Sequence, residues 1–200
     1  MKLIIVRHGE TVENKTEITQ GQNHGKLSDL GLKQAEKLAN YLRGEKIDLA
    51  YCSDLGRCKE SISPLLRIIK IKVNYTPLLR ERGKGIFEGK PRKELIDWSK
   101  DNLGKVPEGG ESREDVDIRA KIFLDKNMKN WKNKTVLIMT HGQTKLSLLN
   151  CLLVINIENQ KFIEEMAPNA SISIVEIDKD KNLFISKLHY TKHLGELNES

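Results

Sequence analysis

Cysteine is scarce in this chain of 200 residues, which contains only Cys52, Cys58 and Cys151. Three unevenly spaced cysteines do not form a disulfide framework, and no C-x-x-C pair indicates a zinc site. Cys52 lies in an apolar run and Cys151 on the apolar face of an expected helix, so both are predicted to be core thiols. This usage of cysteine is typical of a reducing compartment.

Long hydrophobic runs are also lacking. The apolar stretches 136–139 and 148–155 are far shorter than the about 20 residues that cross a bilayer. The sequence begins without a basic segment followed by an apolar signal region. We therefore expect a cytoplasmic protein with no membrane partner.

Aromatic residues are few, at 5% of the chain, and basic residues are not gathered in one segment. The net charge of +6 comes from Lys and Arg that are interspersed with Asp and Glu. Nucleic-acid binding favours basic clusters with aromatic residues among them, so no nucleic-acid partner is expected. Ordinary solubility explains the charge best, and attraction of a small anionic substrate is the second explanation.

The remaining composition is that of a globular protein, with 38% apolar and 31% charged residues. The length predicts a single domain over residues 1–200, and no linker, repeat or low-complexity segment divides it. Strand patterns alternate with helix patterns, which predicts an α/β fold, a three-layer α/β/α sandwich around a mostly parallel sheet. The oligomeric state is not determined by the sequence, and a homodimer is one option.

Hydrophobic periodicity and turn residues place the expected elements. Strands are expected at 3–6, 47–53, 71–75, 135–140, 171–177 and 183–188. Helices are expected at 28–43, 95–98, 112–128 and 144–153, and a further helix is expected to begin after Arg57 and to end at Ile69. Pro64 is expected to bend or interrupt the helix that ends at Ile69. Residues 13–26 and most of 76–110 are expected to be loops.

The first strand ends at the string Arg7-His8-Gly9-Glu10-Thr11. Polar groups just beyond the carboxyl end of a central strand lie where open α/β sheets bind their ligands. Gly9 permits a sharp turn and a close approach of the backbone to a ligand. An imidazole beside a guanidinium indicates chemistry on an anion, because arginine supplies fixed donors and histidine can act as a nucleophile.

Two further apolar strands end in similar groups, Asp54-x-x-Arg57 and His141-Gly142. If the three strands are parallel neighbours, two arginines and two histidines meet at one edge of the sheet. Such a set suits phosphoryl transfer, whose transition state spreads negative charge over three oxygens. The reaction also needs a carboxyl group to protonate the leaving oxygen, and spacing alone does not choose among the acidic residues.

The string from Arg7 to Thr11 resembles the signature of the histidine phosphatase superfamily, which includes the cofactor-dependent phosphoglycerate mutases. The resemblance continues in the order of the family's motifs: Leu27-Ser28-x-x-Gly31-x-x-Gln34-Ala35, Ser53-Asp54-Leu55-x-Arg57, Leu79-Arg80-Glu81-Arg82 with Phe87-Glu88-Gly89, Pro107-x-Gly109-Gly110-Glu111-Ser112, and Thr140-His141-Gly142. It implies a phosphoglycerate mutase-like fold. The Gln20-Gly21-Gln22 loop, residues 79–82 and His193-Leu194 are most similar to the fructose-2,6-bisphosphatase-like phosphatases.

The resemblance implies a role for each of five catalytic residues. His8 is the nucleophile that becomes a phosphohistidine. Arg7, Arg57 and a protonated His141 bind the phosphoryl group and stabilise its transition state. Glu81 protonates the leaving oxygen and then activates the attacking water.

The resemblance also implies residues that bind the substrate. Four match positions that line the family's phosphate pocket, although purely structural roles are nearly as well supported: Asn14, Gln20, Gly21 and Gly142. Lys84 stands where the mutases have a tyrosine. With Arg80 and Arg82 it forms a basic cluster that is expected to favour substrates with a second anionic group.

These residues leave three functions open. The first is a metal-independent phosphomonoesterase without a cofactor, acting on a small phosphorylated metabolite such as a sugar phosphate or a phosphorylated acid. The second is a phosphoglycerate mutase, which the short 85–107 segment disfavours, since it has Arg92-Lys93 in place of the mutases' paired arginines. The third is an inactive phosphate-binding or interaction module, disfavoured because no catalytic residue is missing. No metal site is expected, because the glutamates after Gly110 fit the first turn of a helix.

Overall fold

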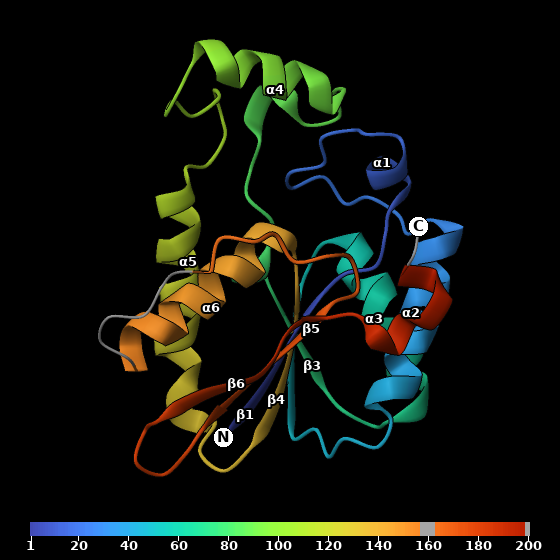
Figure 1. Cartoon of the computed structure of the whole chain (residues 1–200), viewed down its shortest axis with the longest axis vertical. Helices are drawn as coiled ribbons and strands as arrows, with labels where there is room; N and C mark the ends of the chain where they lie inside the picture. The colour runs from blue at the N-terminus through green and yellow to red at the C-terminus, as the bar shows by residue number, and fades with distance from the viewer. Residues whose placement is uncertain (157–162, 199–200) are drawn as a thin grey trace.

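The computed structural model describes residues 1–156 and 163–198 and is built around one sheet (Figure 1). In this part of the chain the sheet has six strands in the order β3-β2-β4-β1-β5-β6. The strands are β1 (Lys2–Arg7), β2 (Leu49–Ser53), β3 (Val73–Thr76), β4 (Thr135–Thr140), β5 (Ile172–Ile177) and β6 (Leu183–Tyr190). Strands β1 to β4 are parallel to one another, whereas β5 and β6 form an antiparallel edge. The predicted, mostly parallel sheet is confirmed.

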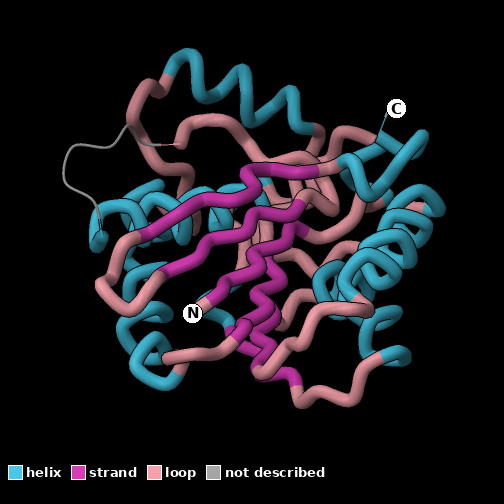
Figure 2. Tube along the Cα trace, turned by 60° about the horizontal axis from the view of Figure 1, so that its bottom comes forward, coloured by secondary structure: helices cyan, strands magenta, loops and turns pink. Residues whose placement is uncertain are grey.

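Helices cover both faces of the sheet and form the outer layers of the sandwich (Figure 2). The helices are α1 (Val12–Lys15), α2 (Asp29–Leu42), α3 (Gly56–Ile68), α4 (Arg92–Asp101), α5 (Arg113–Asn127) and α6 (Gly142–Asn156). Helices α2 and α3 pack against one face, and α5 and α6 against the other (Figure 1). Within the described residues, no helix combines the length and apolar character needed to cross a bilayer.

The unbroken apolar run of β1 follows from its central position. Leu3 and Ile5 face the core under α5 and α6, whereas Ile4 and Val6 face the core under α2 and α3. All four side chains are fully buried. A strand covered on both faces has no position for a polar side chain until it leaves the sheet. The first polar groups after the run therefore appear at the carboxyl edge.

Two segments near this edge contain more helix than the sequence predicts. The predicted 13–26 loop begins with the one-turn helix α1, because Thr11 and Asn14 form a reciprocal capping box. The short helix expected at 95–98 extends over the whole of α4. Both helices lie at the carboxyl ends of the parallel strands (Figure 1). They therefore border the edge where the catalytic residues are expected.

Candidate active site

The carboxyl ends of β1, β4 and β2 meet because these strands are parallel neighbours. A cavity of about 250 Å³ opens there. Among its lining residues are eight that the sequence predicts: Arg7, His8, Asn14, Gln20, Gly21, Arg57, Glu81 and Lys84. The two other predicted residues, His141 and Gly142, lie at the same edge but not in the lining. The lining contains more cationic than anionic side chains, so the cavity favours an anion.

His8 is almost completely buried at the base of this site, with 2% of its surface exposed. Its Nδ1 lies 2.7 Å from the carbonyl oxygen of Gly9. A carbonyl can only accept, so Nδ1 carries the proton and Nε2 keeps its lone pair. Burial lowers the pKa of His8 well below its ordinary value, and the Arg57 and Arg7 guanidiniums lower that pKa further. His8 is therefore neutral, and the lone pair of its Nε2 faces Arg57 and is the nucleophilic position.

His141 is fully buried behind the cavity, with its ring centroid 5.1 Å from that of His8. Its Nδ1 accepts a hydrogen bond from Arg57 Nε at 3.1 Å, so its proton lies on Nε2, which faces Ser53 Oγ at 2.8 Å. Burial, Arg57 and His8 lower the pKa of His141 well below the ordinary value. His141 is therefore expected to be neutral in the free protein, because burial beside an arginine disfavours a second positive charge, and its protonation beside a bound phosphoryl group stays a prediction.

Arg57 forms hydrogen bonds with both histidines. Its Nε also points at His8 Nε2, at 3.3 Å. The other guanidinium nitrogens donate to backbone carbonyls of the loop after α1, including Gly21 at 2.9 Å. Gly21 has a positive φ of 52°, a conformation that favours glycine. Arg57 therefore fixes both imidazoles and the loop that borders the cavity, and it does so with a planar group that lysine cannot replace.

Arg7 supplies a donor that has no protein partner. One terminal nitrogen donates to the carbonyl of Ala167, whereas Nε is buried without a hydrogen-bond partner among the described residues. Gly142 packs directly against this guanidinium: a Cβ at Gly142 would lie 3.5 Å from Arg7 Cζ and 2.7 Å from Met166 Cε. Gly142 thus makes room for the end of the Met166 side chain beside Arg7, and the buried Nε of Arg7 is available to an anion in the cavity.

Glu81 lines the cavity from the loop after β3. Its Oε1 accepts a hydrogen bond from the Arg82 backbone at 2.8 Å, and its Oε2 accepts one from the Gln143 backbone at 3.3 Å. The carboxyl group is thus directed toward the start of α6, where His141 and Gly142 lie. This position suits a group that exchanges protons with a bound phosphoryl ester.

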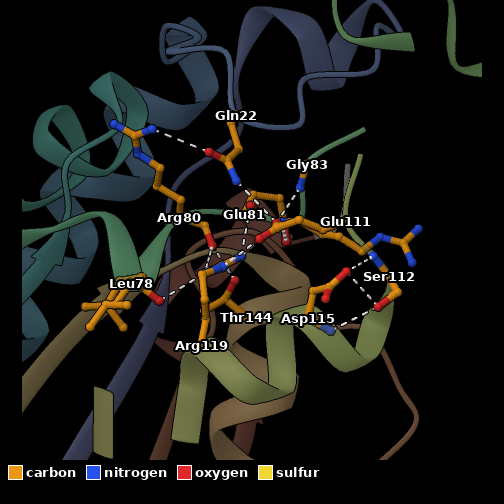
Figure 3. Close-up of polar contacts among 12 residues, drawn as sticks. Gln22, Leu78, Arg80, Glu81, Gly83, Glu111, Ser112, Asp115, Arg119 and Thr144 are labelled. Carbon is orange, nitrogen blue, oxygen red and sulfur yellow. Dashed lines mark hydrogen bonds and ion pairs between the residues drawn. The ribbon is translucent and has the colours of Figure 1, made fainter. Parts of the chain in front are cut away.

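A network of hydrogen bonds from α5 holds the Glu81 loop (Figure 3). Arg119 donates to the backbone carbonyls of Leu78, Arg80 and Glu81 at 2.9, 3.1 and 3.3 Å. The same guanidinium forms a bidentate ion pair with Glu111 at 2.8 and 3.0 Å. Since one planar group binds three backbone carbonyls within residues 78–81, Arg119 is a positioning residue for Glu81.

We expect Arg119→Gln to lower kcat by up to about 100-fold with little change in KM, because a displaced Glu81 impairs proton transfer more than phosphate binding. Steady-state kinetics on a simple aryl phosphate measure both constants. Lys121→Gln, on the exposed face of the same helix, is the matched control and should leave kcat unchanged. A rise in KM at constant kcat would contradict the positioning role.

Several lining residues escaped the sequence analysis. Arg92, Leu95, Gln143 and Met166 belong to this group. The sequence presents Arg92 only as one arginine where the mutases have two. In the structure Arg92 is the first residue of α4 and lines the cavity. Gln143 follows the His141-Gly142 motif directly, and that adjacency is the signal that could have found it. Leu95 and Met166 carry no sequence signal, because only the folding of distant segments brings them to the site.

The predicted basic cluster at the mouth is wrong in two of its three members, because neither Arg80 nor Arg82 is in the described lining of the cavity. Arg80 forms a bidentate ion pair with Asp54, at 2.8 and 2.6 Å, and is absent from the described lining of the cavity. The pairing lowers the pKa of the Asp54 carboxyl, chiefly through the Arg80 hydrogen bond. Arg80 therefore joins its loop to the end of β2. Lys84 remains in the lining, and burial together with Arg82 lowers the pKa of Lys84 to about 8.

The described residues contain no group of three or more His, Cys, Asp or Glu side chains arranged to hold a metal ion. The polar groups of the cavity are instead mainly nitrogen donors and cations. Donors of this kind bind phosphate or carboxylate oxygens.

Comparison with known proteins gives concordant matches. The profile of the histidine phosphatase superfamily (branch 1) matches residues 3–187. A broad-specificity phosphatase of Saccharomyces cerevisiae is 31% identical over 206 residues, covering 98% of this chain and 88% of the yeast protein. The fructose-2,6-bisphosphatase TIGAR of Mus musculus is 40% identical over 133 residues, covering 62% of this chain and 49% of the mouse protein. The structure of Bacillus stearothermophilus YhfR superposes with a TM-score of 0.84 at 24% identity, covering 96% of this chain and 98% of that one.

The fold and the site together define a class of α/β protein whose strand-end anion pocket is lined by His8, Arg7, Arg57 and Glu81, with His141 buried beside His8 and Arg57. The profile match extends over most of the chain, and the yeast relative is similar over nearly all of it. The chain therefore belongs to the histidine phosphatase superfamily, branch 1. The resemblance inferred from the Arg7–Thr11 string and the phosphoglycerate mutase-like fold are both confirmed.

Proposed function

We propose that this protein is a metal-independent phosphomonoesterase that hydrolyses a small phosphorylated metabolite, a sugar phosphate or a phosphorylated acid, through a phosphohistidine at His8. The observation that carries the proposal is the imidazole of His8, whose Nδ1 donates to the Gly9 carbonyl, so that the unprotonated Nε2 lies beside Arg57 in an anion-binding cavity. The membership of the chain in the histidine phosphatase superfamily and the names of its phosphatase relatives support it.

In the first step, the phosphoryl group of the substrate binds to Arg7 and Arg57, and His8 Nε2 attacks the phosphorus. The new P–N bond forms as the P–O bond to the leaving group breaks. Glu81 gives its proton to the departing oxygen, so the alcohol leaves neutral. The developing charge on the equatorial oxygens is stabilised by the two guanidiniums.

In the second step, the Glu81 carboxylate takes a proton from water, and the resulting hydroxide attacks the phosphohistidine. The P–N bond breaks, inorganic phosphate forms, and His8 regains its lone pair. His141 lies against His8 and Arg57 throughout. The negative charge of the bound phosphoryl group favours protonation of His141, so its positive charge is present when the anion is bound.

The functional test is a screen of phosphorylated metabolites for release of inorganic phosphate, run with and without excess EDTA. We expect hydrolysis of several sugar phosphates or phosphorylated acids, with rates unchanged by EDTA, because arginines supply the positive charge. Vanadate, which adopts the trigonal-bipyramidal geometry of the transition state, should inhibit. Activity that disappears in EDTA and returns with magnesium would refute the metal-independent mechanism.

A phosphoglycerate mutase is the second candidate, and the presence of Arg92 in the cavity gives it one supporting observation. A mutase must exclude water from its phosphohistidine, whereas the segment that would provide a lid here is the short 85–107 region with α4. We expect phosphate release from phosphoglycerates to be faster than interconversion of 2- and 3-phosphoglycerate. Both rates are measured on one preparation, and faster interconversion would establish the mutase.

The cytoplasm is the proposed location, because all three cysteines are free thiols. Cys52 is fully buried as predicted, whereas Cys151 is only half-buried and is not a full core residue. A small phosphorylated substrate is the proposed partner. The absence of nucleic-acid and membrane partners remains a prediction, and a homodimer remains one option for the oligomeric state.

A further inference from the structure

The segment 167–171, which leads into β5, lies against the turn that carries the nucleophile. The backbone amide of Ala170 donates to the carbonyl of His8 at 2.9 Å. The backbone amide of Arg7 donates to the carbonyl of Ser171 at 3.1 Å. Segments from opposite ends of the sequence therefore meet directly behind His8.

A buried lysine anchors the same segment. Lys145, on α6, is fully buried and donates from Nζ to the carbonyl and the hydroxyl of Ser171, at 2.9 and 3.0 Å. Ala167, Ala170 and Ser171 are fully buried as well. A closely packed segment that is hydrogen-bonded to both β1 and α6 leaves its side chains few alternative positions. Asn169, which lies within it, is therefore held in place.

Asn169 directs its amide nitrogen at three acceptors. Nδ2 lies 3.2 Å from the carbonyl oxygens of both His8 and Gly9, and 3.4 Å from Oδ1 of Asn14. The Gly9 carbonyl is also the acceptor for the Nδ1 proton of His8, at 2.7 Å. Because carbonyls only accept hydrogen bonds, the group that faces them is the NH2 group of Asn169. Asn169 therefore holds the carbonyl that orients the imidazole of the nucleophile.

The same amide determines how Asn14 presents its side chain to the cavity. Asn14 Oδ1 accepts a hydrogen bond from the backbone N–H of Thr11 at 3.1 Å, and an N–H can only donate, so this atom is the oxygen. The NH2 group of Asn169 is a second donor to the same oxygen. Asn14 lines the cavity, and its own NH2 group donates to none of the described residues. That NH2 group is therefore available to an oxygen of a bound phosphoryl group.

We propose that Asn169 is a positioning residue that acts on two groups: it fixes the Gly9 carbonyl that orients His8, and it directs the NH2 group of Asn14 toward the bound phosphoryl group. This inference rests on the proposed phosphatase function and gives a role in it to a residue outside the described lining of the cavity. Asn169 does not contact the substrate. The bonds formed and broken at His8 are unchanged.

The first test removes the amide in Asn169→Ala. We expect kcat on an aryl phosphate to fall by about 10- to 100-fold, because a misaligned imidazole attacks the phosphorus slowly. The inhibition constant of vanadate should rise by about tenfold, because Asn14 loses its fixed orientation. Asn169→Asp keeps the size of the side chain but places an oxygen against three acceptors, so it should not restore either constant. Activity restored by Asn169→Asp would mean that only packing matters and would overturn the proposal.

Asn127→Ala is the matched control. It removes a partly buried amide that donates to the Phe123 carbonyl at 2.7 Å, at the end of α5 and outside the described lining of the cavity. It should leave kcat and vanadate inhibition unchanged. Equal losses of kcat in Asn127→Ala and Asn169→Ala would indicate general destabilisation and would overturn the proposal.

A double-mutant cycle tests whether Asn169 acts through Asn14. In an Asn14→Ala background, Asn169→Ala should cause no further loss of vanadate affinity, because the NH2 group that it orients is already gone. It should still lower kcat in that background, through His8. Additive losses of vanadate affinity in the double variant would overturn the proposal.

Two measurements need no turnover and therefore separate this proposal from the proposed phosphatase function. Calorimetric titration with inorganic phosphate reports on Asn14, and the NMR signal of the His8 Nδ1 proton, identified by its absence in His8→Asn, reports on the Gly9 contact. Weaker phosphate binding and faster exchange of this proton with solvent in Asn169→Ala, with neither change in Asn127→Ala, would support the role of Asn169 even if no ester were hydrolysed. Phosphate binding and proton exchange that both stay as in the wild type would overturn it whatever the catalytic result.

Discussion

Replacing His8 by alanine is expected to lower the rate of phosphate release by at least about 10⁴-fold, because no other group in the cavity can form the covalent intermediate. The imidazole forms hydrogen bonds with the Gly9 carbonyl and with Arg57. Its removal enlarges the cavity and does not introduce a buried charge. The fold should therefore persist. Turnover is measured with the best substrate from the metabolite screen, and circular dichroism checks the fold.

Trapping the intermediate makes this prediction specific to the nucleophile. Brief reaction of the wild-type protein with substrate, followed by denaturation, should yield acid-labile, base-stable protein-bound phosphate. His8→Asn is the matched variant, because an amide keeps a polar group of similar size and lacks a nucleophilic ring nitrogen. Residual activity above a few per cent in either variant, or labelling that persists in them, would show that His8 is not the nucleophile.

Arg57→Lys is expected to lower kcat/KM by roughly 100- to 1000-fold although it preserves the charge. The guanidinium contacts His8, His141 and the carbonyl of Gly21 at the same time, through nitrogens that point in fixed directions. A lysine ammonium is one compact group on a flexible stem and cannot make these contacts together. Activity close to wild type in Arg57→Lys would mean that charge alone matters at this position.

Arg57→Gln tests the electrostatic part of the same role. Arg57 lowers the pKa values of both buried histidines, so its removal should raise these values toward the ordinary range. A raised pKa means that His8 is protonated, and thus unable to attack, at higher pH than in the wild type. The acid limb of kcat/KM should therefore move to higher pH in Arg57→Gln and not in Arg57→Lys, and NMR titration of the histidines reports the same shift directly.

The local parts of this site could be predicted from the sequence because each depends on one strand and the turn after it. The apolar run 3–6 identifies a buried strand, so the position of His8 at its carboxyl end follows directly. The same logic places Arg57 and His141 at neighbouring strand ends. Pairing of β1 with β4 and of β4 with β2 then brings the three together. The role of Glu81 came from the family resemblance, since strand periodicity does not specify it.

Other features could not be predicted because they depend on contacts between distant segments. The ion pair of Arg80 with Asp54 removes a cation that the sequence alone places at the mouth. The neutral state of His141 depends on complete burial beside Arg57, which no local pattern reveals. An interruption of α3 at Pro64 was one expectation, and it is wrong because the helix continues from Gly56 to Ile68. Packing of its apolar face against the sheet stabilises the helix despite the missing amide proton.

The position of β1 in the sheet also determines when the site can form during synthesis. β1 leaves the ribosome well before its neighbours in the sheet, which are β4 at 135–140 and β5 at 172–177. Until β4 has emerged, the apolar strand that ends in the nucleophile has two unpaired edges, and until β5 has emerged it has one, a state prone to association with other chains. Pairs of strands that are so far apart in sequence form slowly. A nascent chain interrupted before residue 135 therefore carries the whole Arg7–Thr11 string and no active site.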